Sequence, residues 1–182
     1  MPKLPAEPYS EELPAYFNLG ETRAEIKLSS IEDNRNAALA LASQARYNIN
    51  IFSQNMDDAL YNNDEFAEHI FNLATRHPSS QVRILVQDST PAVKKGHRLI
   101  KLAQTLTSSV TVRNPPAKDR GDKCAFMTVD NVGILYRVNG DNKSYDASLN
   151  FMTPQRATKL NEFFNDSWEH GTPDLQVRRL FV

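Results

Sequence analysis

The longest apolar run of this 182-residue chain constrains its fold more than any other stretch, and it extends from Cys124 to Val138 with the sequence CAFMTVDNVGILYRV. Both arms of the run are rich in branched and aromatic residues, which favour β-strands. Between the arms stand Asp130 and Asn131, two residue types that tolerate the positive φ of a tight hairpin turn. The run therefore predicts a β-hairpin at the centre of a sheet.

Strands and helices alternate in the sequence ahead of this hairpin. Apolar runs predict strands over residues 49–52, 82–86 and 110–113, with an edge strand over 24–28. Three helices are predicted between them: one that starts at a capping box of Ser29 and Glu32, one between Asn63 and Pro78, and one that runs from Pro91 through Ala103. Parallel strands joined by helices need right-handed crossovers. We therefore expect an α/β fold whose central sheet is mixed, largely parallel and sandwiched between helices, and which the hairpin joins antiparallel.

The rest of the chain carries weaker signals. Residues 145–151 are expected to return as a strand, Thr153-Pro154 to start a last helix, and residues 175–182 to form a final strand or a surface tether. The inner face of that last helix is predicted to hold Ala157, Leu160, Phe164 and Trp168. The proline-rich residues 1–20 are expected to be a mobile lead, and residues 21–182 one domain.

Composition argues against several classes of protein. No apolar run approaches the ~20 residues that a membrane helix requires, and the start of the chain has no signal-peptide pattern, so we expect a cytoplasmic protein. The single cysteine, Cys124, rules out an intrachain disulfide and a cysteine-based zinc site. A net charge of −1 weighs against nucleic acid as the partner, although a local basic patch is compatible with it. We expect no metal and no cofactor, since the sequence has no glycine-rich phosphate loop, HExxH or CxxC motif.

The order of these elements resembles the phospholipase D-like superfamily over about residues 24–170. That family carries the motif HxKxxxxD on a hairpin, followed by a Gly-Ser pair; its His is the nucleophile and its Lys binds the phosphate. Aligning Asp130 with the motif Asp places Lys123 at the His and Ala125 at the Lys, while the Gly-Ser pair falls at Arg137 and Val138. A protonated lysine cannot attack phosphorus, and alanine offers no phosphate contact. The resemblance therefore implies a catalytically degenerate, single-motif member of a bacterial family of unknown function.

Ligands of open α/β sheets usually bind beyond the carboxyl ends of the parallel strands. The polar residues expected there and around the hairpin predict a cleft for a small anion or a charged peptide group, with the candidates Gln54, Asp88, His97, Arg113, Lys123 and Arg137. The alternative interpretation is structural: Asp88 caps a helix, Arg113 pairs with a carboxylate, and His97 is a hydrogen-bonded residue at the edge of the core.

The leading hypothesis is thus a non-catalytic binding or assembly module whose partner is unknown. One alternative is a cryptic phosphodiesterase or acetyltransferase that uses Asp88, His97 and Lys123, although the chain lacks a glycine-rich coenzyme A loop. Another is a nucleic-acid-binding remnant that keeps the basic residues Lys118, Arg120 and Lys123. The resemblance also implies a homodimer with the hairpins near its axis, because single-motif phospholipase D-like proteins pair two halves across a two-fold axis.

Overall fold

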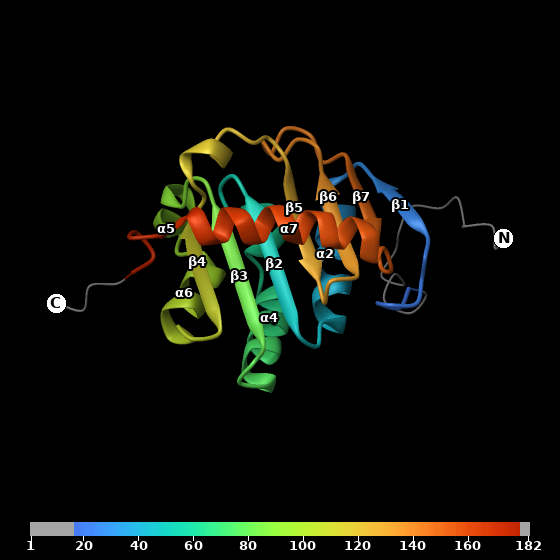
Figure 1. Ribbon diagram of the computed structural model, residues 1–182, viewed down its shortest axis with the longest axis horizontal. Helices are drawn as coiled ribbons and strands as arrows, with labels where there is room; N and C mark the ends of the chain where they lie inside the picture. The colour runs from blue at the N-terminus through green and yellow to red at the C-terminus, as the bar shows by residue number, and fades with distance from the viewer. Residues whose placement is uncertain (1–16, 179–182) are drawn as a thin grey trace.

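A mixed eight-stranded sheet runs through the computed structural model, which describes residues 17–178 (Figure 1). Its strands lie in the order β1-β7-β6-β5-β2-β3-β4-β8. The β2, β3 and β4 strands are parallel, and every other pair of neighbours is antiparallel. The bounds are β1 Glu25–Leu28, β2 Asn48–Ser53, β3 Gln81–Val86, β4 Val110–Asn114, β5 Ala125–Val129, β6 Gly133–Arg137, β7 Ala147–Asn150 and β8 Thr172–Pro173.

Helices cover both faces of the sheet. The long helix α7 (Pro154–His170) lies across one face, and the other helices lie behind the sheet in the view of Figure 1. Those helices are α2 Ile31–Gln44, α3 Asp58–Tyr61, α4 Asp64–Arg76, α5 Thr90–Lys95 and α6 Arg98–Thr105, and a short 3-10 helix, η1, spans Ala117–Asp119. The predicted α/β sandwich is therefore confirmed.

The hairpin occupies the predicted place. It consists of β5 and β6, and β5 pairs antiparallel with β2 in the middle of the sheet. Asp130 and Asn131 both have positive φ, of 49° and 58°. The carboxylate of Asp130 also accepts hydrogen bonds from three consecutive backbone amides, of residues 46, 47 and 48, at 2.7–2.9 Å. Asp130 thus ties the hairpin turn to the start of β2.

The hydrophobic core is divided by the sheet. The larger cluster lies on the side of α2, where Ala38, Leu41, Ala42 and Ala45 are buried on the predicted face. The smaller cluster lies under α7 and contains Phe52, Leu85, Phe126 and Phe164. Small alanine side chains let α2 approach the sheet closely, whereas aromatic rings fill the space under α7.

Four local expectations were wrong or incomplete. The predicted third helix is broken into α5 and α6 at Gly96, which has φ 64°. The first helix is capped by Ser30 instead of Ser29, because the Ser30 hydroxyl accepts the amide of Asp33 at 3.0 Å. The strand or surface tether expected over residues 175–182 lies partly outside the described residues; the last strand, β8, precedes that range, and no strand follows β8 through residue 178. Helix α3 was not predicted.

The expected mobile lead falls mostly on residues 1–16, which lie outside the described residues. Phe17 is already buried and stacks on Phe151, with ring centroids 5.7 Å apart. Within residues 17–178 no helix combines the length and the apolar character needed to cross a membrane.

Candidate functional site

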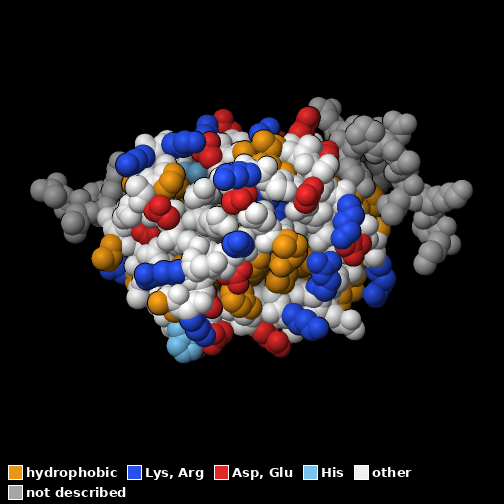
Figure 2. All heavy atoms as spheres, turned by 90° about the horizontal axis from the view of Figure 1, so that it is seen from above, with side chains coloured by type: hydrophobic (Ala, Val, Ile, Leu, Met, Phe, Trp, Pro, Cys, Tyr) orange, Lys and Arg blue, Asp and Glu red, His pale blue; other side chains and the backbone are white. Residues whose placement is uncertain are grey.

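The carboxyl ends of β2, β3 and β4 meet at one edge of the sheet, which we call the carboxyl edge; it is uppermost in Figure 1. Because β5 is antiparallel to β2, the hairpin both begins and ends at this edge, with Ala125 and Arg137 paired there. Figure 2 looks down on this side of the molecule and shows cationic and anionic side chains interspersed around a central group of hydrophobic ones. Among the described residues, this face is therefore mixed in charge.

Three of the predicted site residues converge at the carboxyl edge through backbone contacts. The amide of Asp88 donates to the carbonyl of Gln54 at 2.8 Å, and the Gln54 side-chain amide donates to the carbonyl of Lys123 at 3.1 Å. The carboxylate of Asp88 accepts the amide of Thr90 at 2.9 Å, and the hydrogen bonds from Thr90 hold the pKa of Asp88 below its usual value. Gln54 and Asp88 thus connect neighbouring loops through hydrogen bonds.

Arg137 lies at the same edge but inside the protein. Its guanidinium Nη1 lies 2.5 Å from Oδ2 of Asp57, and both side chains are 3% exposed. Nη2 donates to the carbonyl of Ser144 at 2.8 Å, and the guanidinium carbon lies 4.2 Å from the centroid of the Tyr145 ring. The Tyr145 hydroxyl donates to the other carboxylate oxygen of Asp57 at 3.3 Å. These contacts form a buried ion-pair cluster, defined as Asp57, Arg137 and Tyr145.

Unusual backbone geometry accompanies this cluster. Met56 and Asp57 have φ values of 67° and 22°, and residues other than glycine rarely adopt a positive φ. Such conformations cost on the order of 1–3 kcal/mol each and persist where the surroundings fix them. The ion pair with Arg137 holds the Asp57 side chain in place, and a second residue contacts the backbone of this turn.

That second residue is His97. Its side chain is fully buried, its Nδ1 accepts the amide of Leu99 at 3.1 Å, and its Nε2 lies 3.1 Å from the carbonyl of Met56. Since Nδ1 is an acceptor, the proton is on Nε2 and is donated to Met56. Burial lowers the pKa of His97 to about 4, so the ring is neutral at pH 7. His97 is a support for the strained turn, and its two nitrogens are both occupied.

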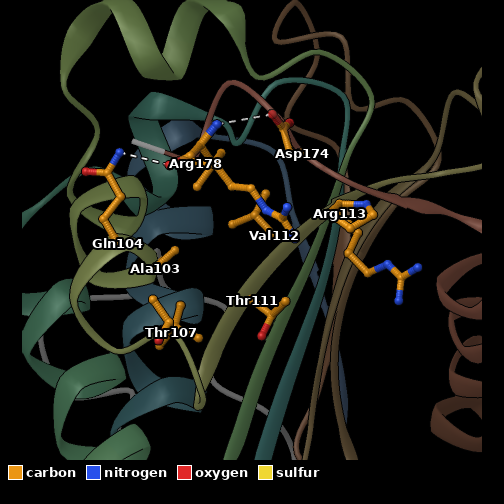
Figure 3. A pocket seen from close by; sticks show the side chains of 11 residues that line it. Ala103, Gln104, Thr107, Thr111, Val112, Arg113, Asp174 and Arg178 are labelled. Atoms are coloured by element: carbon orange, nitrogen blue, oxygen red, sulfur yellow. Dashed lines mark hydrogen bonds between the residues drawn. The ribbon is translucent and has the colours of Figure 1, made fainter. Parts of the chain in front are cut away.

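The side chain of Arg113, which also lies at the carboxyl edge, is directed away from the other candidates. It lines the rim of a hollow of about 450 Å³ beside β4, but its side chain is directed away from that hollow and toward α7 (Figure 3). There Nη2 donates to the carbonyl of Gly171 at 2.7 Å, and the guanidinium carbon lies 5.2 Å from the centroid of the Trp168 ring. The six predicted residues therefore occupy three different environments: the exposed loops, the buried interior and the surface under α7.

The loop that follows β6 contacts both motif positions of the hairpin. The carbonyl of Lys123 accepts the amide of Gly140 at 2.8 Å. A Cβ atom on Gly140 would lie 2.5 Å from the Cβ of Ala125, closer than real Cβ atoms approach one another. The loop that follows β6 therefore rests directly on Ala125, where the family motif has its phosphate-binding lysine.

Asp57 and Tyr145 were missed by the sequence interpretation. Asp57 follows the expected strand at residues 49–52 within the polar run SQNMDD, so its position at a carboxyl edge was a usable signal. Tyr145 gave no signal, because only the folded loop brings it to Arg137.

Comparison with solved structures shows which fold this is. The chain is similar to TrmBL2, an archaeal chromatin protein described as showing a novel mode of DNA binding, with a TM-score of 0.65 and 14% identity over 91% of this chain and 57% of that one. It is also similar to Nuc, a phospholipase D family member from Salmonella typhimurium, with a TM-score of 0.59 and 16% identity over 83% of this chain and 97% of that one. NucT from Helicobacter pylori gives a TM-score of 0.59 and 13% identity over 83% of this chain and 99% of that one.

At these identities the similarity establishes the fold alone, and the fold is phospholipase D-like. No curated protein matches the sequence. The family described as "Domain of unknown function (DUF7931)" matches residues 30–180, most of the chain. The protein therefore belongs to this family of unknown function and has a phospholipase D-like fold.

Proposed function

We propose that this protein is a non-catalytic phospholipase D-like module that binds or assembles with a partner and cleaves no phosphodiester. The observation that carries the proposal is the contact of Gly140 with Ala125, together with Lys123 at the position of the nucleophilic histidine. Beside Ala125, the paired strand β6 ends in Arg137, whose charge is already neutralised by Asp57. The motif therefore has no nucleophile of the family type, and the loop at Gly140 packs against the position of the phosphate-binding lysine.

The cryptic-enzyme alternative finds little support in the geometry. His97 is fully buried with both nitrogens occupied, whereas Lys123 is exposed and the Asp88 carboxylate accepts the amide of Thr90, the first residue of α5. Burial raises the pKa of the Cys124 thiol to about 12, which disfavours the thiolate that a cysteine nucleophile requires.

Hydrolysis of bis-p-nitrophenyl phosphate tests the absence of catalysis. We expect no turnover by the wild type, and none by the double variant Lys123→His with Ala125→Lys, because the loop at Gly140 packs directly against position 125. Turnover that survives rigorous purification and disappears in Lys123→Ala would overturn the proposal.

The partner that we propose first is a second copy of this chain. Val138 is 74% exposed directly after the buried Arg137, and the half-buried Tyr136 lines a hollow of about 400 Å³ beside it. A two-fold contact needs only one such patch, because each copy presents it to the other. Burying an exposed apolar side chain of this size contributes roughly 1.5–3 kcal/mol.

Light scattering at tens of micromolar tests the assembly. We expect twice the chain mass of 20.6 kDa for the wild type and for Leu175→Asp, which changes a residue that is 76% exposed beyond β8. Val138→Asp should give the monomer mass. A monomeric wild type would exclude this partner.

Nucleic acid is the second candidate, and it is supported by the similarity to a DNA-binding chromatin protein. The predicted basic loop offers few free cations. Lys118 pairs with Asp166, and the Arg120 side chain donates to the carbonyl of Pro115. Of the three basic residues, Lys123 alone has neither kind of contact through its side chain among the described residues. Retention on immobilised DNA that falls steeply with salt would favour this candidate, and retention unaffected by salt would exclude it.

A further inference from the structure

A second group of cationic side chains lies on the face of the sheet that α7 covers, away from the hairpin motif. Arg83 on β3 and Arg113 on β4 are diagonal neighbours on this face, because Arg83 pairs with Thr111 and Leu85 pairs with Arg113. Their guanidinium carbons lie 5.4 Å and 5.2 Å from the centroid of one ring, that of Trp168. Both cations therefore gather around a single indole.

Neither guanidinium is neutralised by a carboxylate within residues 17–178. Among these residues, Arg83 donates only to neutral groups: its Nε donates to the side-chain oxygen of Asn50 at 3.0 Å, and its Nη2 donates to that of Asn165 at 2.7 Å. Arg113 donates through Nη2 to a backbone carbonyl, while its Nε is buried and has no partner among the described groups. This arrangement differs from the buried pair at the carboxyl edge, where one carboxylate matches one guanidinium.

Partial burial makes two unmatched cations unfavourable. Burial lowers the pKa of Arg83, which reflects the cost of holding a guanidinium out of water. Attraction to the aromatic face offsets part of that cost. Mutual repulsion of the two cations remains, and the Nη1 groups of both arginines make no hydrogen bond within the described part of the chain.

We propose that Arg83 and Arg113 form a binding site for a phosphate monoester group. A doubly charged phosphate matches two guanidinium groups, and guanidinium donors suit phosphate oxygens in geometry and charge. This site lies outside the degenerate motif and adds a ligand class to the proposed binding module. Free phosphate and the terminal phosphate of an oligonucleotide share this chemistry.

The chain contains one tryptophan, so fluorescence reports directly on this site. Three probes are titrated at constant ionic strength: inorganic phosphate, a 5′-phosphorylated thymidine dinucleotide, and the same dinucleotide without the terminal phosphate. We expect a saturable change with the first two and none with the third. Tighter binding of the phosphorylated dinucleotide, by tenfold or more, would identify an oligonucleotide end as the source, and equal binding would identify free phosphate.

The matched variants are Arg83→Gln and Arg113→Gln, and the control is Arg178→Gln, which removes a cation from the neighbouring hollow without a stacking contact on Trp168 (Figure 3). Each of the first two should weaken phosphate binding at least tenfold, and the control should leave it unchanged. If a variant fails to fold, a competition experiment on the wild-type protein replaces it. Sulfate should displace the phosphate probe, and chloride at equal ionic strength should not. The proposal is overturned by the absence of a saturable change, by equal binding of the unphosphorylated dinucleotide, or by an equal effect of chloride.

Discussion

Nη1 of Arg137 and Oδ2 of Asp57 lie 2.5 Å apart within the protein, although the two residues are separated by 80 positions in the sequence. The pair joins the end of the hairpin to the turn after β2. It therefore connects the two halves of the carboxyl edge across β5.

Removing one member of this pair should destabilise the fold strongly. Arg137→Met or Asp57→Asn leaves a buried charge without its partner, which costs about 3–5 kcal/mol. The double variant should lose less than the sum of the two single changes, because it leaves no unmatched charge. Urea unfolding monitored by circular dichroism measures the three free energies. Additive losses would show that the pair is not coupled.

The turn at Asp130 offers a second test. Asp130→Ala removes three hydrogen bonds to backbone amides and places a less suitable residue at φ 49°, so we expect a loss of about 2–4 kcal/mol. Asn131→Ala is the matched control, since Asn131 has a similar φ of 58° and its side-chain oxygen accepts one hydrogen bond, from Asn161. The melting temperature of Asp130→Ala should be clearly lower than that of the control in thermal unfolding. Equal melting temperatures would mean that the carboxylate contacts contribute nothing.

Stability should fall as the pH is lowered from about 6.5 to 4, because of His97. Its pKa is about 4 in the folded protein and near the ordinary histidine value of 6.5 in the unfolded chain, so in this window the unfolded state binds one more proton. The loss approaches about 3 kcal/mol at the acidic end. The pKa values of Asp58 and Asp88 are lowered in the folded protein, so the stability that these two carboxylates contribute is lost at a more acidic pH.

His97→Asn should flatten this pH dependence, whatever its effect on stability at pH 7. The exposed His77 supplies the control, and His77→Asn should retain the wild-type slope. Denaturant unfolding at half-unit pH intervals gives both slopes. A His97→Asn protein that keeps the wild-type slope would assign the titration to another group.

Much of the fold was predictable because its signals are local. The hairpin turn depends on two neighbouring residues, Asp130 and Asn131, whose chemistry favours positive φ. The parallel strands are apolar runs buried on both faces, and their order in the chain imposes the crossovers. The break at Gly96 was missed because the apolar spacing continues across it, while glycine there takes the left-handed conformation that ends a helix.

The site was less predictable, because its partners are distant in sequence. Arg113 and Arg137 were grouped as cations near the same strand ends, yet alternate residues of a strand point to opposite faces and separate such side chains. Arg113 lies against Trp168 under α7, and Arg137 lies against Asp57 in the interior. Pairing over 80 positions is set by tertiary packing and leaves no periodic pattern to detect.

The contact between Gly140 and Ala125 gives the last prediction. Gly140→Ala should destabilise the protein by about 1–3 kcal/mol, because the new methyl group would collide with the Cβ of Ala125. The φ of Gly140 is not positive, so backbone strain does not add to this cost.

Gly121→Ala is the matched control, since a Cβ there meets nothing within 4 Å and the residue also lacks a positive φ. Its stability should stay within about 0.5 kcal/mol of the wild type. Combining Gly140→Ala with Ala125→Gly removes the opposing methyl group and should restore part of the lost stability. Chemical denaturation of the wild type, the two single glycine variants and the double variant measures the four free energies of unfolding. If Ala125→Gly restores none of the stability lost in Gly140→Ala, the loss does not arise from the contact between positions 140 and 125.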